Sequence, residues 1–170
     1  MKKLLVSLLS AVIIGMMAPI CVAGNSHYNS AYDKSLDNSA LALGGITFGM
    51  STAEVEAIYG KPDKVTEERV DQIRRGKSFS YIYGDSFEIM FNKGQVSIVM
   101  TKADNGIATP AGVHVGDIKG KIATTYGIPW HYNHGYSGIE SYVYRTPDYA
   151  AIRFDVYNGQ IVSIRIIDME

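Results

Sequence analysis

A segment that occurs twice sets the strongest limit on how this chain folds. Residues 45–62 begin Gly-Ile-Thr-Phe-Gly-Met and end Tyr-Gly-Lys-Pro, and residues 112–129 begin Gly-Val-His-Val-Gly-Asp and end Tyr-Gly-Ile-Pro. Later blocks also correspond, at 78–83 with 141–144 and at 92–98 with 158–164. A series of blocks that recurs in the same order indicates a duplicated supersecondary unit. We therefore expect two tandem repeats, over residues 44–104 and 105–170.

Each copy opens with the pattern of one short helix. In the first copy Ser51 is a good N-cap and Glu54 follows at the spacing of a capping box. An apolar stripe at helical spacing and a glycine-proline stop come next, formed by Val55, Ile58, Tyr59, Gly60 and Pro62. The second copy supplies a cap, a stripe and a stop in Asp117, Ile118, Ile122, Tyr126, Gly127 and Pro129. Helices this short are stable only when they pack on a sheet.

The remainder of each copy has the alternation of antiparallel strands. Apolar residues recur at every second position over 87–91 and again over 152–156. Asn158-Gly159 is a strong hairpin signal, because both turn positions need a positive φ. These patterns predict an α+β fold of two tandem units, each a short helical segment packed on an antiparallel three- or four-stranded sheet. We expect residues 44–170 to form one folded domain, with one sheet face in the core and the other at least partly wet.

The N-terminus has the layout of an export signal. Lys2 and Lys3 precede an apolar stretch from Leu4 to about Met17, which is shorter than the roughly 20 residues of a membrane-spanning helix. The small residues Cys21 and Ala23 stand at the −3 and −1 positions of a cut before Gly24. We assign residues 1–23 to a signal peptide that is cleaved after Ala23. The mature protein is then expected to be secreted or periplasmic, without stable membrane insertion.

Cys21 raises the alternative of a bacterial lipoprotein whose first mature residue carries lipid. Lipoprotein processing needs a small residue before the cysteine, and Ile20 with Pro19 behind it does not meet that need. Cleavage after Ala23 also removes the only cysteine, so the mature chain has neither an internal disulfide nor a thiolate metal site. Its stability then has to come from packing.

The segment that follows the cleavage site is polar, and the charge of the chain is balanced. Residues 24–43 begin with a stretch rich in Asn and Ser that lacks an apolar period, so we expect a flexible leader there. The full sequence has 16 Lys and Arg against 17 Asp and Glu, and loss of Lys2 and Lys3 makes the mature chain more acidic. A general nucleic-acid binder or anionic-membrane binder is therefore not expected.

The block from Gly45 to Val55, with Tyr59-Gly60-Lys61-Pro62-Asp63 behind it, resembles the opening of small exported domains related to the β-lactamase-inhibitor protein. It is similar also to the small lipoprotein subunit of the outer-membrane β-barrel assembly machine. The resemblance covers Gly44 to Asp168. It implies an exported, non-catalytic protein that binds another protein through its open sheet face or hairpin loops. The mature chain departs from the inhibitor protein in having no disulfide and from the assembly subunit in having no lipidated cysteine.

The most distinctive local cluster is the aromatic segment 130–136, Trp-His-Tyr-Asn-His-Gly-Tyr. Trp130, His131, Tyr132 and Tyr136 are candidate partner-binding residues, because such side chains bury much area with few rotamers to freeze. This segment differs from the charged one that follows the proline in the first copy, and divergence within a duplicated scaffold leaves positions free for recognition. The alternatives are a surface loop that covers a sheet edge, and a metal site formed by His131 and His134 with His114 as a third ligand.

Two pairs of tyrosines form a second candidate surface. Tyr81 with Tyr83, and Tyr142 with Tyr144, stand at the spacing that places side chains on one face of a strand. They either line an exposed recognition surface across both units or belong to the core with their hydroxyls at its rim.

No catalytic motif is evident in the sequence, since it has no nucleophile elbow, phosphate loop or zinc-protease helix motif. We therefore predict a protein that is not an enzyme and needs no cofactor. The leading interpretation is an exported protein-binding or inhibitory module whose partner is another protein. The alternatives are a structural accessory of cell-envelope or outer-membrane assembly, and an exported metal-binding protein that uses the loop of His131 and His134.

Overall fold

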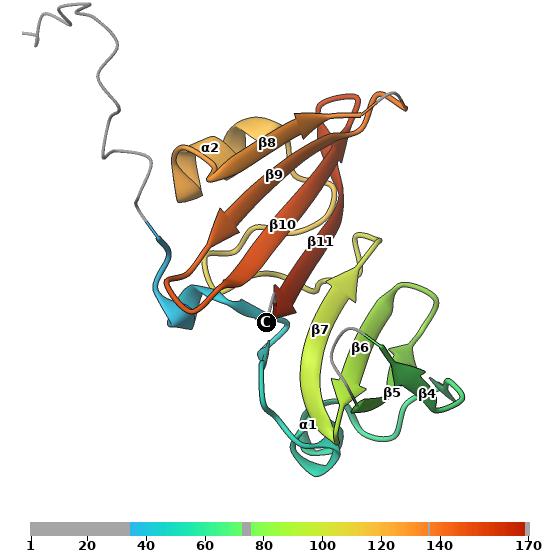
Figure 1. The fold of residues 1–170 in the computed structure, drawn as a ribbon. Helices are drawn as coiled ribbons and strands as arrows, with labels where there is room; N and C mark the ends of the chain where they lie inside the picture. Colours follow the sequence, from blue (N-terminus) through green and yellow to red (C-terminus); the bar gives the residue numbers. More distant parts are fainter. Residues whose placement is uncertain (1–34, 73–75, 136, 169–170) are drawn as a thin grey trace, which may run out of the picture.

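One large antiparallel sheet organises the protein (Figure 1). The computed structural model describes residues 35–72, 76–135 and 137–168. Nine strands form this sheet, in the spatial order β3 (Lys64–Val65), β5 (Gly76–Tyr83), β6 (Phe87–Asn92), β7 (Gln95–Thr101), β11 (Gln160–Asp168), β10 (Ala150–Tyr157), β9 (Glu140–Arg145) and β8 (His131–His134), with β4 (Arg69–Asp71) also paired to β5. A separate two-stranded sheet contains β1 (Ala42–Leu43) and β2 (Ile46–Thr47).

The prediction of two tandem helix-plus-sheet units is wrong. The described residues contain two α-helices and are mostly antiparallel β-structure, and the sheet runs without a break from β3 to β8. The junction is the pairing of β7 with β11, in which Thr101 faces Ile164 and Ile98 faces Ile167. Two separate sheets would each leave an edge of unpaired backbone groups at this point. Pairing the two edges satisfies those groups and makes one sheet from both halves of the chain.

The first helix, α1 (Thr52–Tyr59), begins as the sequence predicts. The Oγ atom of Ser51 accepts a hydrogen bond from the backbone N–H of Glu54 at 3.3 Å, and the Glu54 carboxylate accepts one from the Ser51 N–H at 2.7 Å. The capping box is therefore confirmed. Gly60 ends the helix with a φ of 76°, a conformation that glycine adopts without strain.

The second helix, α2 (Lys119–Tyr126), begins one residue later than the predicted cap requires. Its N-cap is Ile118, which has no side-chain capping bond. The Asp117 carboxylate instead accepts hydrogen bonds from the backbone N–H of His114 at 2.9 Å and from Nζ of Lys121 at 2.7 Å. The assignment of Asp117 as the cap is therefore wrong, because these donors engage the carboxylate in the loop before the helix.

The Asn158-Gly159 hairpin is confirmed. It joins β10 to β11, and its two residues have φ values of 50° and 78°. The hairpin between β6 and β7 has the same geometry at Lys93 and Gly94, with φ values of 53° and 78°.

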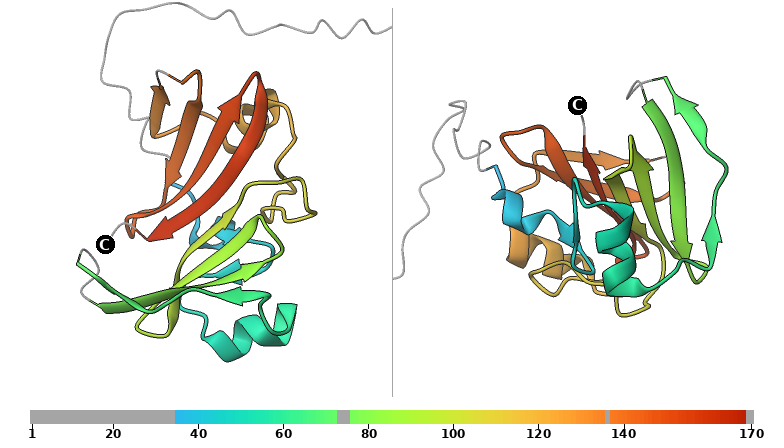
Figure 2. Two further views of the ribbon diagram at one scale, coloured as in Figure 1. Left: turned by 90° about the vertical axis from the view of Figure 1, so that its right-hand side faces the viewer. Right: turned by 90° about the horizontal axis from the view of Figure 1, so that it is seen from below.

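Both helices pack on one face of the sheet, which we call the helix face (Figure 2). The ring of Tyr59 from α1 lies 5.1 Å from that of Phe87, and the ring of Tyr126 from α2 lies 5.1 Å from that of Phe154. Strand pairing places their partners in one row across the sheet, namely Tyr83, Phe87, Thr101, Ile164, Phe154, Tyr142 and Tyr132. Directly paired residues share a face, so one helix face runs through both halves.

A single core cluster lies beneath the two helices. It includes Val55 and Ile122 from the helices and apolar residues from β6, β7, β10 and β11. Leu41 and Leu43 also belong to it, and Leu43 is completely buried. The packed chain therefore begins before residue 44, within the segment that the sequence assigned to a flexible leader. A short 3-10 helix, η2 (Asn38–Ala40), precedes these buried residues; the predicted signal peptide lies outside the described residues.

Candidate interaction surface

The four strand tyrosines lie on the helix face, and their hydroxyl groups are engaged within the fold. Tyr83 donates to the backbone carbonyl of Gly60 at 2.9 Å, and Tyr144 donates to that of Gly127 at 3.0 Å. Each therefore ties the C-terminal end of its strand to the glycine that ends the helix above it. Tyr81 and Tyr142 donate to the carboxylates of Glu56 and Glu140, at 2.8 and 2.6 Å respectively. These contacts favour a role in the fold for the set Tyr81, Tyr83, Tyr142 and Tyr144.

Burial also changes the acidity of these tyrosines. Desolvation, with smaller contributions from neighbouring acidic groups and tyrosines, raises the pKa of Tyr83 to about 12. Desolvation and then the neighbouring Tyr126 raise the pKa of Tyr144 to about 12. Both hydroxyls remain protonated at any physiological pH, so they act as hydrogen-bond donors and not as catalytic bases.

The aromatic segment supplies the outermost strand of the sheet, β8. All four residues of β8 are exposed, and Trp130, which precedes the strand, is 45% exposed. Tyr132 is 49% exposed although its ring lies 5.0 Å from that of Tyr142 on the neighbouring strand. The Trp130 ring lies over the guanidinium group of Arg145, with Cζ 4.8 Å from the ring centroid. We call the surface of residues 130–134 the β8 edge.

Glu140 connects the β8 edge to the rest of the protein. Its carboxylate accepts hydrogen bonds from the hydroxyls of Tyr142 at 2.6 Å and Tyr132 at 3.3 Å, and from Nζ of Lys119 at 2.9 Å. The bond from Tyr142 and then the bond from Lys119 lower the pKa of Glu140 below its usual value. An ionised Glu140 thus joins β8, β9 and the first turn of α2.

The two histidines of β8 do not point toward each other. His131 pairs with Val143 and His134 pairs with Glu140, three positions apart along a strand whose side chains alternate between faces. Their imidazoles therefore project from opposite faces, and the strand cannot direct both to one ion. His114 lies in another loop, 3.6 Å from Oδ1 of Asp104. Within the part of the chain that the structure describes, no three His, Cys, Asp or Glu side chains gather as a metal site.

The two edges of the sheet differ in how well they are protected against pairing with another chain. At one edge, β3 and β4 are separate short strands that both pair with β5 and carry the charged residues Lys64 and Arg69. Short, charged, interrupted edge strands are a common protection against pairing with another chain. The β8 edge is one uninterrupted strand, His-Tyr-Asn-His, with no Lys, Arg, Asp or Glu. It is the less protected of the two edges.

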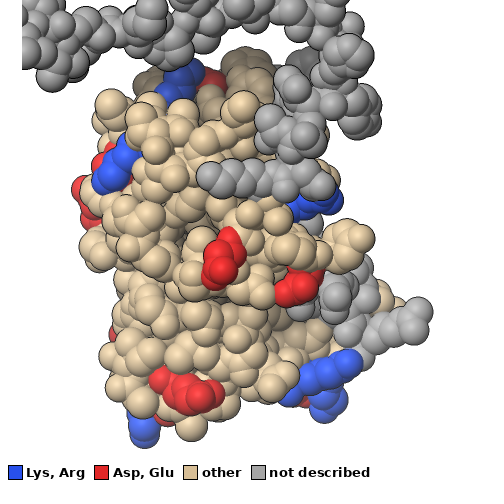
Figure 3. Space-filling view, turned by 90° about the vertical axis from the view of Figure 1, so that its left-hand side faces the viewer, with Lys and Arg blue, Asp and Glu red and all other residues tan. Residues whose placement is uncertain are grey.

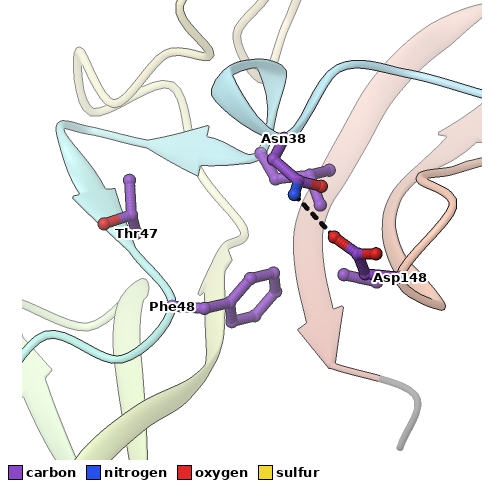
Figure 4. Close-up of a pocket in the computed structure, with 6 residues that line it drawn as sticks. Asn38, Thr47, Phe48 and Asp148 are labelled. Carbon is purple, nitrogen blue, oxygen red and sulfur yellow. Dashed lines mark hydrogen bonds between the residues drawn. The ribbon is translucent and has the colours of Figure 1, made fainter.

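Sequence reasoning missed two features outside the aromatic segment. Figure 4 shows a shallow pocket between the N-terminal segment and the β9–β10 turn, where Nδ2 of Asn38 donates to the Asp148 carboxylate at 2.7 Å. Its volume is about 280 Å³ and Phe48 lines one wall.

The second feature is Arg165 on the central strand, which the alternation of β11 places on the face opposite the helices. The sequence holds a signal for this arginine, because it is a charged residue between two isoleucines of the core.

Tyr136 lies outside the described residues. Trp130, His131 and Tyr132 are brought together at the β8 edge, whereas Tyr81 and Tyr83 lie on β5, on the other side of the central strands. The candidate residues thus form no single continuous site.

The surface in Figure 3 carries scattered acidic and basic side chains and no extended patch of one sign. Neither described helix has the length and apolar character that crossing a bilayer requires.

No family model matches the sequence, and no curated protein matches it. Among solved structures, an extracellular protein containing an SCP domain from Bacillus anthracis matches with a TM-score of 0.48 and 10% identity, over 87% of this chain and 50% of that one. A cysteine-rich secretory protein from Staphylococcus aureus matches with a TM-score of 0.48 and 13% identity, over 71% and 43%. A DUF4309 family protein from Bacillus subtilis matches with a TM-score of 0.42 and 15% identity, over 83% and 92%. The chain spans half or less of the first two structures.

Proposed function

We propose that this protein is an exported, non-catalytic module that binds another protein through the β8 edge. The observation that carries the proposal is the exposure of Trp130 and Tyr132 on the outermost strand of the sheet. Trp and Tyr are enriched among the residues that contribute most to binding energy at protein interfaces. An edge strand adds unpaired backbone groups that an extended segment of a partner can bond.

The arrangement of the edge also favours binding on energetic grounds. The Arg145 guanidinium beneath the Trp130 ring and the Tyr142 ring beside Tyr132 hold both side chains in place before a partner arrives. Side chains ordered in advance lose less conformational entropy on binding. The Tyr132 hydroxyl also donates a hydrogen bond to the Glu140 carboxylate at 3.3 Å. The β8 edge is therefore a supported surface and not a free loop.

Export is the second part of the proposal and is supported by the N-terminal sequence. The basic start, the apolar stretch and the small residues before Gly24 form the pattern of a cleaved signal. The intact mass of the protein recovered from the envelope or medium tests this. We expect the mass of an unmodified chain whose first residue is Gly24. A diacylglycerol adduct on Cys21 would contradict both the cleavage site and the unacylated state.

The binding proposal is tested by affinity capture with the mature protein and two variants. We expect the double substitution Trp130→Ala with Tyr132→Ala to weaken binding of the captured partner by at least about tenfold. Tyr157→Ala is the control, because Tyr157 is also an aromatic residue at the end of a strand and is 48% exposed. Far-UV circular dichroism checks that each variant is folded.

The capture distinguishes among roles for the same surface. One stoichiometric enzyme as the partner supports an inhibitory role, and recovery of assembly-machine components supports an accessory role in the cell envelope. Normal binding by the folded double variant contradicts the β8 edge as the binding surface.

A further inference from the structure

We propose that the face of the sheet opposite the helices receives an acidic side chain from a loop of a protein partner, held by the guanidinium group of Arg165. This inference rests on the proposed protein-binding function but concerns a surface other than the β8 edge. We call it the open face, because both described helices lie on the other side of the sheet (Figure 2).

Arg165 occupies the middle of the open face. It lies on β11, which is the only described strand that pairs with both β7 and β10. Its paired neighbours are Met100 on β7 and Arg153 on β10. The row continues across the sheet on the same face through Ile82, Glu88, Met100, Arg165, Arg153, Val143 and His131. A loop that docks against the centre of the open face meets Arg165.

The two arginines of this row differ in their partners. Nε of Arg153 donates to the Asp155 carboxylate at 2.7 Å, and its Nη2 donates to the Ser141 hydroxyl at 3.0 Å. Arg165 donates from Nη2 to the sulfur of Met100 at 3.1 Å, and its buried Nε has no hydrogen-bond partner among the described residues. A thioether is a weak acceptor. The positive charge of Arg165 is therefore uncompensated, whereas that of Arg153 is paired.

No carboxylate of the described open face reaches Arg165. Glu88 stands in the same row but two strands away, which is about 10 Å at the usual strand spacing. Asp155 is already engaged by Arg153 and by the hydroxyl of Ser141 at 2.7 Å. A partly buried charge without a partner costs free energy in the unbound protein. A carboxylate brought by a partner would remove that cost and match the planar fork of the guanidinium.

The surroundings of Arg165 favour a protein loop as the source of that carboxylate. The adjacent row of the open face holds apolar side chains, Met90, Ile98 and Ile167, which are partly exposed. Contact with apolar groups of a loop would exclude water from the ion pair and strengthen it. The open face also carries Glu88 and Asp155, so its charge is mixed and a polyanion such as nucleic acid does not fit.

The first test measures the stability of the unbound protein. Arg165→Met keeps an unbranched apolar stem in place of the arginine stem and removes the charged guanidinium group, so we expect the melting temperature to stay the same or rise. Lys64→Met, at the exposed edge of the same row, is the control for loss of one positive charge. A melting temperature that falls well below that of the control shows that Arg165 already has a stabilising partner, and this overturns the proposal.

The second test uses a library of disulfide-constrained peptide loops displayed on phage and selected against the mature protein. We expect enrichment of Asp or Glu in the selected loops. The best loop should bind Arg165→Met at least about tenfold more weakly, and its own acid-to-amide change should weaken binding to the wild type equally. Lys64→Met should bind that loop normally.

The Trp130→Ala with Tyr132→Ala variant separates this inference from the proposed function. Loops that lose binding with that variant and keep it with Arg165→Met support the β8 edge and overturn the role of Arg165. Acidic loops with the reverse dependence support Arg165. A selection that gives no loop dependent on Arg165 also overturns it.

Discussion

Removal of one hydroxyl decides whether the strand tyrosines serve the fold or a partner. Tyr144→Phe removes the donor that bonds the Gly127 carbonyl at 3.0 Å, from a residue that is 3% exposed. A neutral hydrogen bond of this kind contributes about 0.5–1.5 kcal/mol to the free energy of unfolding. The ring keeps its contacts with Tyr126 and Phe154, at centroid distances of 5.3 and 6.1 Å. The loss should therefore be about 1 kcal/mol, well below the roughly 3–5 kcal/mol for loss of a whole buried aromatic side chain.

Urea unfolding of the mature protein measures this difference. The midpoint should fall with Tyr144→Phe while the denaturant slope stays unchanged, because the surface exposed on unfolding is the same. Tyr132→Phe is the matched control. Its hydroxyl donates to Glu140 at 3.3 Å from a side chain that is half exposed, so its effect should stay within about 0.5 kcal/mol.

One pair of results would refute the reasoning. If Tyr144→Phe leaves the free energy of unfolding unchanged and weakens binding of a captured partner, Tyr144 belongs to a recognition surface. The assignment of these tyrosines to a role in the fold would then need revision.

Four further substitutions test other contacts. Ser51→Ala removes the capping box of α1 and should lower the free energy of unfolding by about 1 kcal/mol. Ile118→Asp supplies α2 with the side-chain cap that it lacks and should raise the urea midpoint. Asn158→Ala places alanine at a φ of 50° and should cost about 1 kcal/mol in thermal unfolding, an expectation that an unchanged melting temperature contradicts. Hydrogen bonds from Tyr142 and then from Lys119 hold the pKa of Glu140 below its usual 4.5. The ionised form therefore stabilises the protein fully above about pH 5.5. This stabilisation is lost as the pH falls through the lowered pKa of Glu140 in the folded protein. Glu140→Gln should accordingly lower the urea midpoint at neutral pH and much less at about pH 3, and a constant difference would show that ionisation is not the cause.

Local features were predictable from the sequence because their causes are local. The capping box depends on two residues three positions apart, and the Asn158-Gly159 turn depends on the φ preferences of its own residues. The opposite directions of His131 and His134 could also have been inferred once the segment was taken as a strand, because side chains alternate along it.

The continuous sheet was not predictable in the same way. Alternation of apolar residues shows which face of a strand is buried but not which strand lies beside it. The pairing of β7 with β11 joins residues such as Met100 and Arg165, which are far apart in the chain. The i and i+2 spacing of Tyr142 and Tyr144 indicated a shared face, yet only the position of α2 shows that this face is covered.

The place of β11 between β7 and β10 has a consequence for how an exported chain acquires its structure. It is the last of the nine strands in chain order, yet it is the one that closes the centre of the sheet. On the proposed export route, a chain threaded across a membrane from its N-terminus would present β7 and β10 before β11, each with an unpaired edge. Folding is therefore completed only after the final strand arrives, and an incompletely translocated chain presents two open edges to its neighbours. A factor that shields strand edges during export would protect this protein in that interval.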